Sequence, residues 1–133
     1  MLRLPARLLS RLLAEADGRP DEEICGLLAG RAGEAEIHLP VENALHSDGA
    51  FDMDPAGLIA AMRRIRESGR ELVGIYHSHP HGPAFPSATD VASNQYPEVI
   101  HGIIGREEGE WRLRVFRLDG EVGELELRIT AEE

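Results

Sequence analysis

The 133-residue chain contains no lysine, only one cysteine and few aromatic residues, and no apolar run in it approaches the length of a membrane span. With Cys25 alone, no intrachain disulfide can form, and we expect a cytoplasmic protein without a membrane partner. All 14 bases are arginine and face 24 acids, which gives a net charge of −10 and argues against nucleic acid as a partner. The 42% apolar content with 5% aromatics predicts a single domain, residues 1–133, with an aliphatic core.

Two segments have the apolar spacing and the terminal residues of amphipathic helices. In residues 5–17, leucines recur at helical spacing after a first-turn proline, and Gly18 supplies a stop. In the second segment, Asp54 and Pro55 form an N-cap and first-turn pair, and apolar residues follow at helical spacing until Gly69. The arginines of this second helix are interpreted first as a solvated surface and second as a docking patch for an acidic partner: Arg63, Arg64 and Arg66.

Six segments have the composition of β-strands. The run from Ile24 to Gly30 is short and nearly all apolar, which is typical of a strand buried on both faces. The turn at residues 31–33 predicts a hairpin with the strand that follows. The last two segments show the alternating apolar pattern of strands. The six predicted strands are residues 24–30, 34–41, 72–79, 98–105, 111–118 and 122–129.

A group of possible metal ligands lies at the end of the third predicted strand. His77 and His79 are separated by one residue, so period-two strand geometry puts both imidazoles on one face. Pro80 ends the strand, and the histidines therefore lie at a strand's carboxyl end, where open α/β sheets bind ligands. Ser87-x-x-Asp90 is typical of a helix start, and the Asp90 carboxylate can swing back over the strand end. Two imidazoles and one carboxylate then converge.

The donor types indicate which metal this group would bind. Two neutral nitrogens, one anionic oxygen and a vacant fourth position match catalytic zinc, which takes three protein ligands and a water. Non-haem iron(II) uses the same two-histidine, one-carboxylate set, so the triad alone leaves an oxygenase open. A lone strand histidine is usually structural, and an isolated Ser-x-x-Asp is an ordinary capping box, but the two motifs together favour a metal. We expect one Zn2+ per chain.

The pattern His77-Ser-His79-Pro80, a gap of six residues and Ser87-x-x-Asp90 resembles the signature of the JAMM (MPN-plus) metallopeptidases. The segment from Glu23 to Gly30 is similar to the strand that carries the catalytic glutamate of that family. The resemblance implies an α/β fold of the cytidine-deaminase-like kind, a mixed β-sheet flanked by helices, and a zinc hydrolase of peptide or isopeptide bonds. The chain lacks the long insertions of eukaryotic deubiquitinating members and is similar to stand-alone prokaryotic ones, which implies a ubiquitin-like or sulfur-carrier protein as substrate.

Glu23 is the candidate general base. A carboxylate at the start of a buried strand is costly unless it has a partner or a task, and beside zinc it could accept a water proton and pass it to a leaving amine. The residues alone also allow Glu22 and Glu23 to be a solvated pair in the turn after Pro20. The resemblance favours Glu23, and because a one-residue shift flips the face of a strand, Glu22 is the specific alternative.

The remaining reactive side chains have smaller expected roles. The Ser87 hydroxyl can accept a hydrogen bond as a helix cap while it donates its proton to a developing oxyanion. Cys25 lies within an apolar strand and is interpreted as an inert core residue rather than a nucleophile. His81 is close enough to the ligand pair to line the site but is the weaker ligand candidate. His38 and His46 are expected on the surface.

Two functions from other classes compete with the zinc hydrolase. A non-catalytic protein-binding module of the MPN fold would be expected to have lost metal ligands, whereas this chain keeps all three together with Glu23. A non-haem iron enzyme with the same donors would take up iron and oxygen. Hydrolysis that needs only zinc and proceeds without oxygen would distinguish the zinc hydrolase from the iron enzyme.

Overall fold

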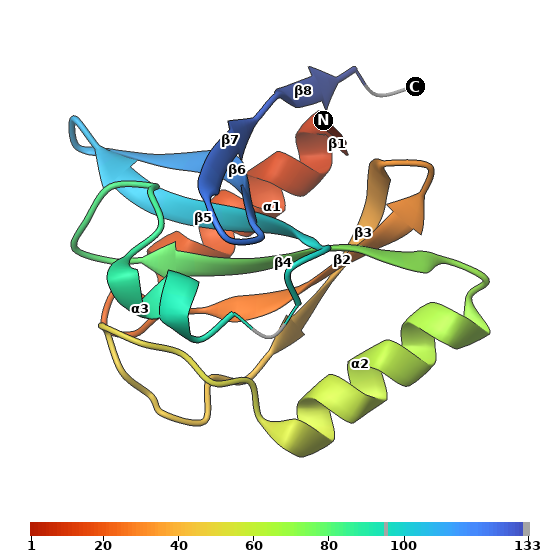
Figure 1. Ribbon diagram of the computed structural model, residues 1–133, viewed down its shortest axis with the longest axis horizontal. Helices are drawn as coiled ribbons and strands as arrows, with labels where there is room; N and C mark the ends of the chain where they lie inside the picture. The colour runs from red at the N-terminus through yellow and green to blue at the C-terminus, as the bar shows by residue number, and fades with distance from the viewer. Residues whose placement is uncertain (95, 132–133) are drawn as a thin grey trace.

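The computed structural model describes residues 1–94 and 96–131, which form a mixed eight-stranded sheet with helices on both faces (Figure 1). The strand order is β7-β6-β5-β4-β2-β3-β1-β8. The strands are β1 (Leu2–Pro5), β2 (Cys25–Arg31), β3 (Glu34–Val41), β4 (Glu71–His79), β5 (Ile100–Glu107), β6 (Glu110–Leu118), β7 (Val122–Leu125) and β8 (Leu127–Thr130). The helices are α1 (Ala6–Gly18), α2 (Pro55–Glu67) and α3 (Ala88–Ala92). Within these ranges, no helix combines the length and apolar character that crossing a membrane requires.

The centre of the sheet brings the candidate site residues to one end. β2 and β3 form the predicted hairpin, whose turn residues Ala32 and Gly33 both have positive φ, as a tight two-residue hairpin turn requires. β4 lies between β2, to which it is antiparallel, and β5, to which it is parallel. Because β2 runs against β4, the residue before β2 lies beside the last residues of β4, with Cys25 opposite His77. Glu23 and the two histidines therefore meet at one end of these central strands.

The two faces of the sheet are covered by different helices. Leu8, Leu12 and Ala16 of α1 are buried against β-strand residues that include Leu28 and Tyr76. On the opposite face, α2 buries side chains against a second cluster that contains residues of β2, β3 and β4: Ala61 and Ile65 against Leu27, Leu39 and Ile75. The predicted N-cap is confirmed, since Asp54 Oδ2 accepts a hydrogen bond from the Gly57 amide at 2.8 Å. The three arginines of α2 are exposed, as expected.

The outermost strands differ from the prediction. The predicted strand 122–129 is two strands, because β7 pairs with β6 at one edge of the sheet whereas β8 pairs with β1 at the other. A single residue, Glu126, separates them, and its carbonyl accepts a hydrogen bond from Leu2 N at 3.0 Å. Since one residue joins the two edges, the sheet must curl strongly, and β7 and β8 follow one another in Figure 1. β1 was not predicted, because it pairs with β3 and β8, neither of which is its neighbour in the sequence.

Candidate metal centre

Four side chains converge where β4 ends. One ligand atom from each of Glu23, His77, His79 and Asp90 lies within 4.8 Å of the others. His77 Nε2 lies 3.1 Å from both His79 Nε2 and Asp90 Oδ1, and His79 Nε2 lies 3.0 Å from Asp90 Oδ2. Donors bound at about 2.0–2.1 Å to a tetrahedral zinc ion lie roughly 3.3 Å apart, so the nitrogens and the carboxylate have the spacing of ligands to one ion.

The tautomer of His79 supports the same interpretation. Its Nδ1 lies 3.0 Å from the carbonyl oxygen of Pro83, which can only accept, so Nδ1 carries the hydrogen of the neutral ring and Nε2 presents a lone pair to the cluster. The loop that supplies this carbonyl is fixed to β5, because Arg106 N donates to Gly82 O at 2.7 Å and a Cβ at Gly105 would collide with the Pro83 main chain. The Nε2 atoms of His77 and His79 and the Asp90 carboxylate thus face one another, and these electron-rich groups require a cation or protons between them.

The protonation preferences of the cluster match a cation site. Burial opposes ionisation of Asp90, but its hydrogen bonds with His77 and His79 hold the pKa of the carboxyl well below its usual value. Burial lowers the pKa of His77. Burial also acts to lower the pKa of His79, but the hydrogen bond and charge of Asp90 outweigh it and raise that pKa. The carboxylate is therefore held as an anion, and a positive charge beside it is favoured.

The predicted capping box at the start of α3 is present. Ser87 Oγ accepts from Asp90 N at 3.0 Å, and Ser87 N donates to Asp90 Oδ2 at 2.8 Å. These two bonds orient the Asp90 carboxylate toward the histidines. The Ser87 hydroxyl accepts in this arrangement, so its own proton remains available for another acceptor.

Glu23 and Glu22 are both buried, at 4% and 7% exposure, so the interpretation as a solvated pair is wrong. Glu22 is turned away from the cluster, because its Oε2 accepts from an Arg19 guanidinium nitrogen at 2.8 Å and lies 3.4 Å from His46 Nδ1. Glu23 faces the cluster, and its Oε1 has no hydrogen-bond partner among the described residues. Burial raises the pKa of the Glu23 carboxyl to about 7.

Other residues considered from the sequence lie outside the cluster. Cys25 is buried, its thiol donates to the Val41 carbonyl at 3.3 Å, and burial raises its pKa to about 12, in agreement with an inert core residue. His81 is exposed and pairs with Asp48 at 3.2 Å. His46 is exposed, as expected, but the surface prediction for His38 is wrong because it lies half-buried near the ring of Tyr76.

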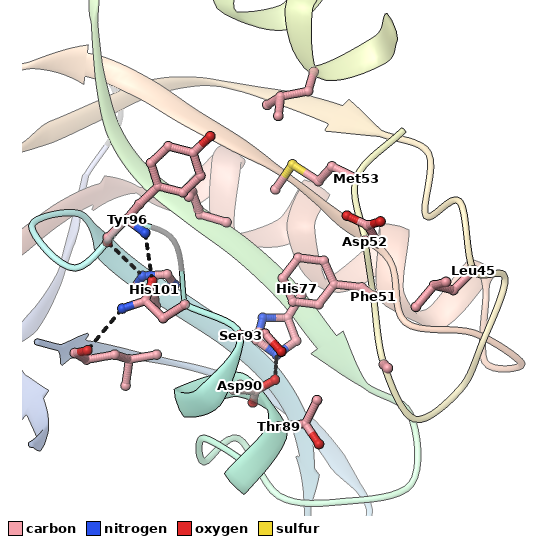
Figure 2. Close-up of a pocket in the computed structure, with 15 residues that line it drawn as sticks. Leu45, Phe51, Asp52, Met53, His77, Thr89, Asp90, Ser93, Tyr96 and His101 are labelled. Atoms are coloured by element: carbon pink, nitrogen blue, oxygen red, sulfur yellow. Dashed lines mark hydrogen bonds and ion pairs between the residues drawn. The ribbon is translucent and has the colours of Figure 1, made fainter. Parts of the chain in front are cut away.

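A cavity of about 480 Å3 adjoins the cluster and shares His77 and Asp90 with it (Figure 2). One wall is the loop before α2, where Phe51 stacks on the His77 ring with centroids 4.5 Å apart. The opposite wall includes Tyr96 and His101. Spacing along the sequence gave no signal for His101, because it reaches the cavity from β5, the strand beside β4.

The chain is similar to known proteins in sequence and in fold. Residues 5–118 match the family model described as prokaryotic homologs of the JAB domain. The chain is 32% identical over 128 residues to the CysO-cysteine peptidase of Mycobacterium tuberculosis, covering 93% of this chain and 88% of the relative. It is 37% identical over 108 residues to a probable TtuB-protein conjugate cleaving protease of Thermus thermophilus, covering 79% and 72%. A solution structure from Desulfitobacterium hafniense matches with a TM-score of 0.87 and 34% identity, covering 99% of this chain and 94% of that one.

Proposed function

The chain belongs to the family of prokaryotic homologs of the JAB domain, and we propose that it is a zinc-dependent peptidase that cleaves a peptide or isopeptide bond at the carboxyl terminus of a ubiquitin-like or sulfur-carrier protein. The names of its relatives, a CysO-cysteine peptidase and a TtuB-protein conjugate cleaving protease, support the substrate class. The observation that carries the proposal is the Glu23 carboxylate beside the cluster of His77, His79 and Asp90. It is buried, and one of its oxygens has no hydrogen-bond partner among the described residues. A buried acid of this kind is costly unless it has a task.

Each residue of the site has a separate part in the proposed reaction. His77, His79 and Asp90 hold the metal, and zinc bound there would lower the pKa of a water and polarise a scissile carbonyl. Glu23 Oε1 accepts the proton of the attacking water and then delivers it to the nitrogen of the leaving amine. The Ser87 hydroxyl donates a hydrogen bond to the carbonyl oxygen as negative charge develops on it.

We further propose that residues 1–133 form a single domain that acts in the cytoplasm. All the strands of the described residues belong to one sheet, which supports a single folding unit. The lone thiol, Cys25, is buried, and the fold uses no disulfide.

The function is tested with purified zinc-loaded protein under anaerobic conditions. The protein is incubated with a panel of ubiquitin-like and sulfur-carrier proteins that carry carboxyl-terminal extensions or isopeptide-linked adducts, and truncation is read by mass. We expect cleavage by the wild type and by the matched control Glu22→Gln, and cleavage slower on the order of 1,000-fold by Glu23→Gln. Cleavage by Glu23→Gln at a rate close to that of the wild type, or cleavage that requires iron and oxygen, would overturn the proposed mechanism.

A further inference from the structure

Asn43 is a buried polar residue to which the proposed reaction assigns no role. It is 2% exposed and lies two residues after the end of β3. Its Nδ2 donates to the carbonyl oxygens of Glu23 at 3.0 Å and Ala50 at 3.1 Å, while its Oδ1 accepts from the amides of Leu45 and Asp52, both at 3.1 Å. Both hydrogens and both lone pairs of the carboxamide are therefore used. The network also fixes which atom is oxygen, since two carbonyls face one side and two amides the other.

The main chain at Glu23 depends on this network. β2 begins at Cys25, so the β-ladder does not hold the peptide groups of Glu23. Its carbonyl is held by Asn43, and its amide donates to the Ser47 carbonyl at 2.7 Å. The next amide, of Ile24, donates to the hydroxyl of Ser78, the residue between the two histidines, at 2.9 Å. Two of these three anchors belong to residues 43–52, so this loop determines where the Glu23 carboxylate lies.

The same carboxamide also shapes the cavity. The segment whose amides and carbonyl it binds carries Phe51, which stacks on the ring of His77. Residues of this segment form one wall of the 480 Å3 cavity: Leu45, Ala50, Phe51 and Asp52. One side chain thus ties a wall of the cavity to the main chain of the proposed base.

We propose that Asn43 is a positioning residue that holds Glu23 beside the metal-ligand residues and couples its placement to the loop that contacts His77. This inference rests on the proposed function, because the effect on turnover is exerted through Glu23 as general base. Removing the donor side of the carboxamide would release the Glu23 carbonyl, and a shift of about 1 Å at a reacting group lowers the rate on the order of 100-fold.

The first experiment does not depend on activity. Amide hydrogen exchange of metal-free wild type and Asn43→Ser is compared, with Asn94→Ser as the matched control. Asn94 bridges the Tyr96 amide and the Leu118 carbonyl on the opposite cavity wall and is not bonded to Glu23. We expect the Glu23 and Asp52 amides to exchange at least about tenfold faster in Asn43→Ser only, because local opening controls their exchange.

The second experiment measures turnover and zinc content for Asn43→Asp, Glu23→Gln and the double variant. Aspartate keeps an acceptor for Leu45 and Asp52 but turns a carboxylate oxygen toward the Glu23 carbonyl. We expect Asn43→Asp to keep its zinc and to lose on the order of 100-fold in kcat. In the Glu23→Gln background the same substitution should cost less than about threefold, whereas Asn94→Asp should cost the same factor in both backgrounds.

The outcomes are separable. Equal losses for Asn43→Asp in both backgrounds, or loss of zinc in step with kcat, would overturn the positioning role, as would unchanged exchange at Glu23 in Asn43→Ser. If Asn43→Asp does not fold, Asn43→Ser takes its place in the kinetic cycle with the same expectation. If the wild type cleaves no conjugate, the proposed function fails, and hydrogen exchange alone decides whether Asn43 holds Glu23.

Discussion

Each side of the sheet has a carboxyl group that burial makes harder to ionise, Glu15 of α1 on one side and Glu23 on the side of the possible metal ligands. Glu15 has a partner, because the hydroxyl of the buried Tyr76 donates to its Oε1 at 2.8 Å. Glu23 has an oxygen with none among the described residues. Burial raises both pKa values, but only at Glu15 does a donor from the protein offset it.

This difference separates an acid that has a hydrogen-bond donor within the protein from one that has an oxygen without a donor among the described residues. A hydrogen bond from a buried tyrosine compensates the cost of burying Glu15, and the pair links α1 to β4. At Glu23 the charge of His79 favours the carboxylate, but Oε1 has no hydrogen-bond donor among the described residues, so the remaining cost is recovered when a ligand, a water or a proton reaches the site. We expect the two acids to respond differently to substitution and to a change of pH.

The largest difference is expected in catalysis. Glu23→Gln removes the proton acceptor and should lower kcat on the order of 1,000-fold with zinc content retained, because general acid–base catalysis contributes about 10²–10⁴-fold. Glu15→Gln should stay within about threefold of wild type. Steady-state kinetics with metal analysis measure both, and comparable losses of kcat for the two variants would contradict a specific role of Glu23 in turnover.

A second test asks whether other polar groups on the face of Glu23 act on the substrate. Ser87→Ala should cost roughly 3 kcal/mol of transition-state stabilisation, on the order of 100-fold in kcat, because it removes the proposed donor to the oxyanion. Ser87→Thr keeps the hydroxyl and serves as the control. Zinc content is measured beside turnover, and a parallel loss of both in Ser87→Ala would assign Ser87 to metal binding alone.

The pH dependence of stability should distinguish the two carboxyls in the metal-free protein. The pKa of Glu23 is about 7 in the folded state, above the ordinary value of 4.5, so its stabilising contribution is present at low pH and is lost as pH rises through 7. Relative to Glu23→Gln, the free energy of unfolding of the wild type should therefore fall by roughly 2–3 kcal/mol between pH 5 and pH 8. Urea unfolding with a chelator present measures this loss. A smaller loss is expected relative to Glu15→Gln, and a larger one would contradict the assignment.

The smallest effect concerns the paired acid. Tyr76→Phe leaves Glu15 without its donor and should lower the free energy of unfolding by about 1–2 kcal/mol. Because a protonated carboxyl tolerates the loss better than a carboxylate, the cost should be larger at pH 8 than at pH 5. Urea titration at pH 5 and at pH 8 measures this cost, and the zinc content of Tyr76→Phe should equal that of the wild type. A loss of zinc in this variant would show that the two faces are not independent.

Local patterns in the sequence predicted the parts of the fold that local interactions determine. The Asp54 cap and the turn at residues 31–33 are read from neighbouring residues, and the helices and hairpin that depend on them are present. β1 could not be predicted, because its four residues acquire strand geometry only by pairing with β3 and β8, which are distant in the sequence. The alternation in residues 122–129 predicted a strand, but nothing in it marks Glu126 as the point where the chain changes from one edge to the other.

The site was predictable to the same extent. The one-residue spacing of His77 and His79 and the capping box predicted which side chains converge, because strand and helix-cap geometry are local. Which of Glu22 and Glu23 faces the cluster depends on Arg19 and other residues that bind Glu22 in the folded chain. These contacts cannot be predicted from the residue types alone. Asn43 escaped prediction for the same reason, since its partners come from two separate segments.

The joint at Glu126 has a consequence for aggregation. One short segment, Val122–Thr130, supplies the outermost strand on both sides of the sheet, so β6 and β1 are both capped by the same piece of chain. A cut or a detachment within this segment would lay bare two rows of unpaired backbone groups at once, each able to recruit a strand from another molecule.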